Sequence, residues 1–184
     1  PPTTDEASRR IRLPPGFAIR TFAERLEGAP RMMSVGPDGQ LYVTLMYGGQ
    51  LARLPDHNRD GRADRVEVVA DGLELPHGLE WHRGWLYVAA STTIIRLRPG
   101  DGGWERETVL TDIPGPSGHF TRTLHFGPDG RLYVSVGSET NFGPERDPRR
   151  AAILRFNPDG SLPEDNPFAS DPDPRRRVIW AEGL

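Results

Sequence analysis

The chain has 184 residues, a net charge of −3, 21 glycines and 19 prolines, and 35% of its residues are hydrophobic. This is about one domain with enough apolar residues for a core, and it is punctuated too heavily for a helix bundle or a coiled coil. The absence of cysteine and lysine excludes disulfides, thiolate metal sites, and cysteine or lysine nucleophiles. The charge gives no reason to expect nucleic acid as a partner, and no apolar run approaches the ~18 residues of a membrane span.

The N-terminal segment is predicted to be a polar arm over residues 1–16, followed by a single strand at the start of residues 17–30. The arm has no apolar h-region, so we expect no signal peptide in this chain. The sequence Phe-Ala-Ile-Arg-Thr-Phe at 17–22 favours a strand, but no neighbouring strand pattern accompanies it. We expect this lone strand to pair with a sheet outside its own unit.

The rest of the chain repeats one pattern three times. Each unit has a turn that ends in glycine, then one residue of any type, then Leu-Tyr-Val, and the turn glycines are evenly spaced, at Gly39, Gly84 and Gly130. Glycine tolerates the positive φ of such turns, and Leu-Tyr-Val favours a strand. Two further strand patterns follow in every unit, at 50–54 and 65–69, at 93–97 and 106–110, and at 152–156 and 177–180.

Four short strands in a unit of ~45 residues match the size of a β-propeller blade. We therefore predict an all-β fold, a β-propeller with three four-stranded blades over residues 31–75, 76–116 and 117–184, the last with two loop insertions. Closed propellers typically have about 4–8 blades, so both end faces of this chain need a covering partner. The lone strand at 17–22 suits the outer strand that closes such a ring onto its last blade.

A calcium-binding loop is predicted between two strands of the first blade. Residues 56–67 fit the pattern D-x-[DN]-x-[DN]-G-x5-E at every position. Calcium prefers about six to eight hard oxygen ligands, and Gly61 allows the sharp turn that brings them together. The alternative is an Asx-rich turn that binds no metal. The candidate ligands are Asp56, Asn58, Asp60, the carbonyl of Arg62, Asp64 and Glu67.

The segments that precede the first strand of each blade carry the candidate channel residues. Aligning the three units places Arg31, His77 and Arg122 at one equivalent position. The first strand of a propeller blade is innermost, so these side chains are expected to border one central cavity. His119 lies three residues before Arg122, in a segment rich in glycine and proline that can present it at the mouth of the channel.

The third unit carries the closest resemblance to a known family. Residues 118–138 include Gly-His-Phe-Thr-Arg-Thr-Leu, Phe-Gly-Pro-Asp-Gly and Leu-Tyr-Val-Ser-Val-Gly-Ser, and segments at 13–17, 75–79 and 145–153 agree. In these motifs the chain resembles the soluble quinoprotein glucose/sorbosone dehydrogenases. Those enzymes are six-bladed propellers that hold pyrroloquinoline quinone (PQQ) with a calcium ion. The resemblance implies that the three blades are half of a six-bladed ring, the N-terminal half. The cysteines of the sorbosone branch near 140–141 are missing here.

The resemblance also implies roles for individual residues. His119 would be the general base that takes the proton from the C1 hydroxyl of a sugar while hydride passes to the quinone, and a neutral imidazole suits that task near neutral pH. Arg122 and His77 would line the cofactor side of the cavity, where an arginine suits carboxylates. For each of them the alternative is a purely structural side chain. The family's remaining blades, which supply most cofactor contacts and the cofactor's own calcium ligands, have no counterpart in this sequence.

Three functions remain open on these grounds. The first is half of a PQQ- and calcium-dependent aldose dehydrogenase, inactive or weakly active alone, which the resemblance would place in the periplasm or outside the cell. The second is a non-catalytic half-propeller that self-assembles into a six-bladed ring. The third is a lactonase-like propeller hydrolase, the weakest reading, because those enzymes bind a channel metal with carboxylates and asparagine. In the first two, the expected partner is a second half-propeller, a second copy of this chain forming a homodimer.

Overall fold

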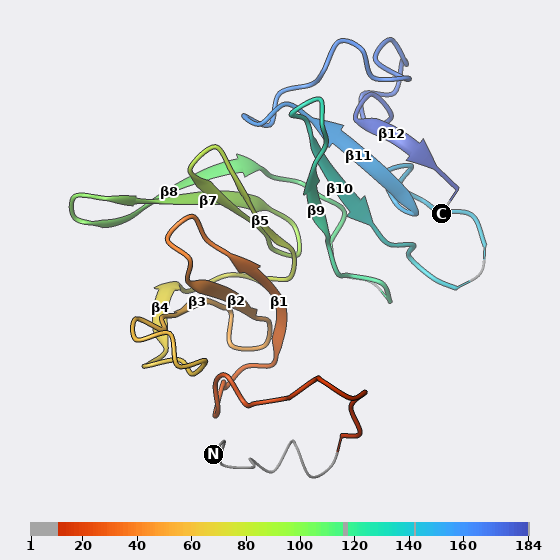
Figure 1. The fold of residues 1–184 in the computed structure, drawn as a ribbon. Helices are drawn as coiled ribbons and strands as arrows, with labels where there is room; N and C mark the ends of the chain where they lie inside the picture. Colours follow the sequence, from red (N-terminus) through yellow and green to blue (C-terminus); the bar gives the residue numbers. More distant parts are fainter. Residues whose placement is uncertain (1–10, 116–117, 142, 184) are drawn as a thin grey trace.

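The fold is known from a computed structural model that describes residues 11–115, 118–141 and 143–183. In this part of the chain, all regular secondary structure is β-strand, arranged in three separate four-stranded antiparallel sheets. Figure 1 shows the sheets fanned out around their first strands. The predicted all-β propeller with three four-stranded blades is confirmed. The described residues contain no helix long and apolar enough to cross a membrane.

Each sheet is a meander in which the strands follow one another in chain order. Blade 1 contains β1 (Pro30–Val35), β2 (Leu41–Leu45), β3 (Gln50–Leu54) and β4 (Glu67–Ala70). Blade 2 contains β5 (Leu79–His82), β6 (Trp85–Ala89), β7 (Ile94–Gly100) and β8 (Gly103–Leu110). Blade 3 contains β9 (Leu124–Phe126), β10 (Leu132–Val136), β11 (Ala152–Phe156) and β12 (Ile179–Glu182). The innermost strands β1, β5 and β9 contact one another in turn, as the first strands of propeller blades should.

In blades 1 and 3, an aspartate shapes the turn between the first two strands by bonding within the turn and to side chains of the next two strands. In blade 1, Asp38 accepts hydrogen bonds from the backbone N–H of Gln40 at 3.1 Å and from the hydroxyl of Tyr42 at 3.1 Å, and it pairs with Arg53 at 2.8 Å. These contacts tie the β1–β2 turn to β2 and β3. Blade 3 repeats the arrangement with Asp129, Tyr133 and Arg155.

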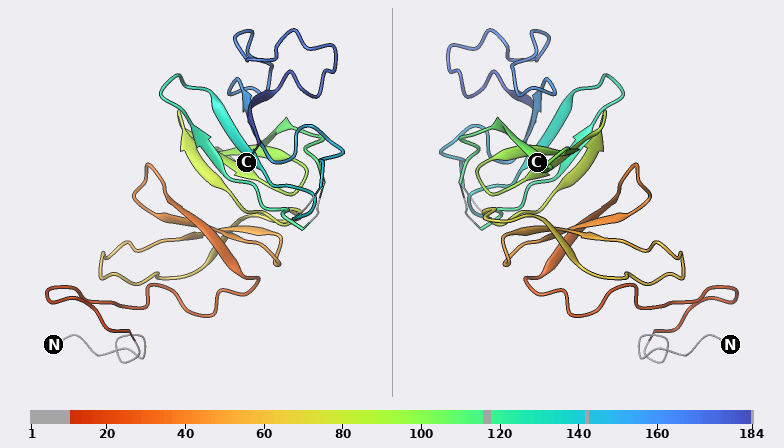
Figure 2. Two further views of the ribbon diagram at one scale, coloured as in Figure 1. Left: turned by 90° about the vertical axis from the view of Figure 1, so that its right-hand side faces the viewer. Right: turned by 90° about the vertical axis from the view of Figure 1, so that its left-hand side faces the viewer.

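Two hydrophobic cores lie between consecutive blades. The first joins Tyr42 and Leu51 of blade 1 to Leu86 and Val88 of blade 2, all of them fully buried. The second joins blade 2 to all four strands of blade 3. Side views show the sheets stacked one behind another, with the N-terminal segment beside blade 1 and the long β11–β12 connection at the far side of blade 3 (Figure 2). The two outermost sheet faces therefore have no further sheet packed on them in the described part of the chain.

Two local expectations differ from the structure. Residues 17–22 form no strand and pair with none of the three sheets, although Phe22 packs on the outer face of blade 1. None of the outer edge strands β4, β8 and β12 pairs with this segment, and its role in ring closure stays a prediction. The unit alignment predicts Arg31 before the first strand, but Arg31 lies within β1, because the antiparallel pairing already begins at Pro30.

Candidate functional site

His119 lies in the loop before β9, beside the end of β10, and its side chain is exposed. Its Nδ1 is 3.0 Å from Oγ and 3.3 Å from the carbonyl oxygen of Ser138. The Ser138 hydroxyl donates to the carbonyl of Thr140, so both of its nearby oxygens act as acceptors toward the imidazole. Nδ1 therefore carries the proton in the neutral ring, and Nε2 is the acceptor. This is the tautomer that a general base requires at Nε2.

The loop can approach β10 so closely because residue 137 is glycine. A Cβ at Gly137 would clash with the backbone and Cβ of His119. The Val-Gly-Ser sequence at the end of β10 thus both admits the His119 loop and supplies its hydrogen-bonding partner. In the sequence, Ser138 is only part of a family motif; its role as the partner of His119 depends on the close approach of two loops far apart in the chain.

Arg122 is fully buried, 1% exposed, which differs from the channel-lining role expected for it. Its Nη1 donates to the carbonyls of His119 at 3.3 Å and Thr121 at 3.0 Å, and its Nη2 donates to the carbonyl of Pro114. Burial, together with the charge of Arg150, lowers the pKa of Arg122 to about 10. The guanidinium thus donates to three backbone carbonyls and fixes the loop that carries His119. Its Nε is buried without a hydrogen-bond partner, and a role in cofactor binding stays a prediction.

His77 connects the leading ends of blades 1, 2 and 3. Its Nδ1 is 3.1 Å from the carbonyl oxygen of Arg122, and its own carbonyl accepts the hydroxyl of Thr44 at 2.8 Å. Burial is the main cause that lowers the pKa of His77, and the charge of Arg31 adds to it. His119, Arg122 and His77 therefore lie next to one another, through contacts of their main chains as well as their side chains. Arg31, not Arg122, is the exposed arginine of the three equivalent positions.

The depressed pKa of His77 makes a prediction about stability and pH. The unfolded chain, with an ordinary histidine pKa of about 6.5, binds the proton more readily than the folded chain does. This contribution to stability is therefore full above about pH 6.5 and is lost as the pH falls through the folded pKa. We expect His77→Gln to flatten the decline of the free energy of unfolding between about pH 7 and 5, as measured by urea titrations at several pH values. An unchanged slope would contradict the assignment.

The predicted calcium loop is only partly assembled. The Asp56 carboxylate accepts the backbone N–H groups of Asp60 and Gly61 at 3.1 and 3.0 Å, and Asn58 bonds to Asp60 at 3.0 Å. These contacts curve the first half of the loop around its oxygens. Among the described residues, no three His, Asp or Glu side chains are grouped closely enough to hold a metal ion.

The last two predicted ligands of the loop have other partners. Asp64 pairs with the ring of His57 at 2.8 Å. Glu67 lies on β4 and pairs with Arg53 and Arg65 instead of facing the loop. None of these contacts involves the carbonyl of Arg62. The structure thus brings together Asp56, Asn58 and Asp60, and calcium binding by the full predicted set stays a prediction.

Comparison with known proteins gives a family and a fold. A family model described as "Domain of unknown function (DUF7133)" matches residues 3–165. No curated protein matches the chain in sequence.

Several solved structures match the fold at low sequence identity. A putative glucose dehydrogenase from Thermus thermophilus is 23% identical with a TM-score of 0.63, covering 85% of this chain and 52% of that one. The PQQ-bound aldose sugar dehydrogenase from Streptomyces coelicolor is 22% identical with a TM-score of 0.62, covering 82% and 50%. A calcium structure of a Trichoderma reesei enzyme of carbohydrate-active family AA12 is 22% identical with a TM-score of 0.62, covering 75% and 37%. The expected resemblance is confirmed for the fold, and the chain spans about half, or less, of these proteins.

Proposed function

The chain belongs to the family described as a domain of unknown function, DUF7133, and from its fold and site we propose that it is the His119-bearing half of a PQQ-dependent aldose dehydrogenase propeller. The observation that carries the proposal is the exposed imidazole of His119, held by Ser138 with Nε2 as the acceptor. The solved structures with this fold include a glucose dehydrogenase and a PQQ-bound aldose sugar dehydrogenase. They support the proposal, and the three blades here correspond to half of such a ring.

His119 would perform the proton-transfer part of the reaction. Its Nε2 would accept the proton of the sugar's C1 hydroxyl, while Nδ1–H stays bonded to the Ser138 oxygens and holds the ring in orientation. Arg122 would keep this geometry by fixing the carbonyls of His119 and Thr121. PQQ, when bound, would supply the acceptor for the C1 hydride.

This chain supplies a residue that can act as the general base, His119, but its residues do not fit the binding of PQQ. The quinone's carboxylates need cationic donors, and three Nη hydrogen bonds of the buried Arg122 already go to backbone carbonyls. The remaining cofactor contacts would therefore come from the neighbouring half of the ring. We accordingly expect the chain by itself to show little or no turnover. On the same resemblance we place the protein in the periplasm or outside the cell.

A dye-linked assay tests this function. The ring assembled from this chain and its partner half would be mixed with an artificial electron acceptor and a panel of aldoses, with and without PQQ and calcium. We expect turnover of at least one aldose that requires PQQ. Absence of PQQ-dependent turnover across the panel would overturn the proposal. It would favour the second candidate, a non-catalytic half-propeller. The bonding of the Arg122 guanidinium to backbone carbonyls supports that candidate.

The loop at residues 56–67 is proposed to bind a calcium ion that stabilises blade 1. Calcium at a hundred times its Kd would add about 2.7 kcal/mol to the free energy of unfolding. We expect the double variant Asp56→Ala, Asp60→Ala to melt at a lower temperature and to lose the rise in Tm that calcium gives the parent. A matched control replaces two exposed acidic residues elsewhere, Asp101 and Glu164, by alanine. If the loop variant responds to calcium as the parent does, the loop is only a turn.

A further inference from the structure

Every blade has a front face and a back face, and the strand register shows which residues lie on each. On the front face, a tyrosine of the second strand stands opposite an arginine of the third: Tyr42 and Arg53, Tyr87 and Arg96, Tyr133 and Arg155. On the back face, three apolar residues, one from each of the first three strands, stand side by side in the register and form an apolar row. These rows are Val35, Leu41 and Leu54; Trp81, Leu86 and Leu97; and Phe126, Leu132 and Phe156.

Both junctions inside the chain use the same contact. The front-face tyrosine of one blade meets the first aromatic residue of the back-face row of the next, edge to face. Tyr42 packs against Trp81 with ring centroids 5.2 Å apart, and Tyr87 packs against Phe126 at 4.8 Å. Both tyrosines are 1% exposed. A tyrosine that docks on an apolar row is thus the way in which this chain joins blade to blade.

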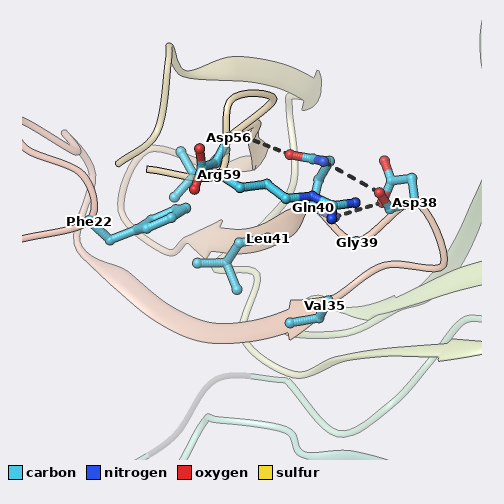
Figure 3. Close-up of a pocket in the computed structure, with 9 residues that line it drawn as sticks. Phe22, Val35, Asp38, Gly39, Gln40, Leu41, Asp56 and Arg59 are labelled. Carbon is cyan, nitrogen blue, oxygen red and sulfur yellow. Dashed lines mark hydrogen bonds between the residues drawn. The ribbon is translucent and has the colours of Figure 1, made fainter. Parts of the chain in front are cut away.

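The back face of blade 1 has the row without the tyrosine. Val35 is 64% exposed, although the equivalent Phe126 is 8% exposed. A hollow of about 430 Å³ opens here, with Val35, Leu41 and Leu54 in its wall and Phe22 at one side. Figure 3 shows the labelled apolar side chains of this wall below the polar rim of Gln40 and Asp56.

The polar rim also has an equivalent in a filled junction. Asp56 lies two residues beyond the end of its row, where blade 3 has Pro158. The carbonyl of Pro158 accepts the Tyr87 hydroxyl at 2.9 Å. In the hollow, both carboxylate oxygens of Asp56 already accept backbone N–H groups of their own loop, and Tyr133 donates its hydroxyl to Asp129, so the tyrosine would dock through its ring.

The front face of blade 3 carries the equivalent tyrosine, Tyr133, but in the described residues no following blade packs an apolar row against it. Tyr133 is held by Asp129 at 3.0 Å, as Tyr42 is held by Asp38, and Arg155 stands beside it in the register. It is only half-buried, and Trp180 of its own blade contacts it at 5.8 Å. Trp180 is itself 40% exposed. The chain therefore carries a half-buried tyrosine at one end. At the other end it carries a row of which Val35 is exposed, while Leu41 is half-buried and Leu54 is buried beside Phe22.

We propose that the hollow on blade 1 is a socket for Tyr133 of a second copy of this chain. Tyr133 and the socket lie on opposite end faces of one chain, so the contact between two copies is head-to-tail. Two copies, each with three blades, would close into a ring with two-fold symmetry. Closure would cover the exposed parts of both end faces, Val35 on blade 1 and Trp180 on blade 3 among them. The inference rests on the proposed ring assembly but not on its chemistry.

Light scattering with complementing variants tests the socket. The chain at micromolar concentration is expected to have twice the mass of the 20.5 kDa monomer. Val35→Arg, which places a charge in the socket from an exposed position, and Tyr133→Ala are each expected to give monomers. Mixing the two variants is expected to restore a dimer, because one of its two junctions then combines an unaltered Tyr133 with an unaltered socket. Tyr47→Arg and Tyr47→Ala, on the exposed β2–β3 turn, are the matched controls and should stay dimeric.

Every result of this experiment decides the inference. A parent chain of 20.5 kDa would exclude a second copy as the occupant. A dimer that withstands Val35→Arg would exclude the socket as its interface, and the same holds for mixed variants that fail to pair. If Tyr133→Ala is misfolded by circular dichroism, Val35→Arg alone decides between these outcomes. The assay contains no sugar or quinone, so a failure of the proposed chemistry leaves its result unchanged.

Discussion

Replacing Gly78 by alanine is expected to lower the free energy of unfolding by about 3 kcal/mol, the upper end of what overpacking costs. A Cβ at this position would lie 2.5 Å from the carbonyl oxygen of Arg122 and 3.0 Å from the backbone nitrogen of Leu124. Both atoms belong to the backbone of blade 3, so no side chain can turn away. Gly78 also donates its N–H to that Arg122 carbonyl at 2.9 Å, and the clash would break this link between the blades.

The measurement is thermal unfolding beside a glycine that has room. Gly102, in the β7–β8 turn, has nothing within 4 Å of an added Cβ and no positive φ, so Gly102→Ala is the matched control. For a chain of this size we expect Gly78→Ala to lower Tm by roughly 6–12 °C, and Gly102→Ala to leave it nearly unchanged. Equal Tm values for the two variants would show that blades 2 and 3 do not meet as closely as described.

Replacing His119 by glutamine is expected to lower kcat of the assembled protein by about 10²–10⁴-fold. Glutamine can still donate its amide N–H to the Ser138 oxygens, so the loop should keep its position. It has no basic nitrogen, so the proton of the sugar hydroxyl would have no acceptor. The measurement is PQQ-dependent aldose turnover, with Tm as the check on folding.

His125→Gln is the matched control for this substitution. His125 lies on β9, its side chain is 74% exposed, and it pairs with Glu80 at 3.3 Å. We expect turnover within about twofold of the parent, because surface substitutions of this kind have small effects. Comparable losses from both substitutions would point to a general disturbance of blade 3, and full activity of His119→Gln would remove His119 from the base role.

Repetition made the fold predictable from the sequence. The glycine turns and Leu-Tyr-Val strands recur three times, so an error in one unit is corrected by the other two, and the structure has the three four-stranded sheets that the repeats predict. Residues 17–22 did not follow their strand propensity, because a strand also needs a partner edge. Nothing local in the sequence states whether that edge is present.

The site was less predictable because its geometry depends on contacts between distant loops. The motif placed His119 and Arg122 in one segment. The burial of Arg122, however, depends on a hydrogen bond to the carbonyl of Pro114, which lies outside that motif. Ser138 meets His119 only because the structure folds the end of β10 against the loop before β9. In the metal loop, spacing predicted the turn around Asp56, while the pairing of Glu67 with Arg53 depends on the register of β3 and β4.

The central claim is that this chain supplies the base of a PQQ-dependent sugar dehydrogenase whose site is complete only in a closed ring. The most direct test is to separate the protein by size in the presence of PQQ and calcium and to assay aldose oxidation in every fraction. We predict turnover in the fraction that contains the closed ring, assembled with its partner half, and none in the 20.5 kDa fraction of the chain alone. Turnover by the monomer, or none in either fraction, would contradict the account.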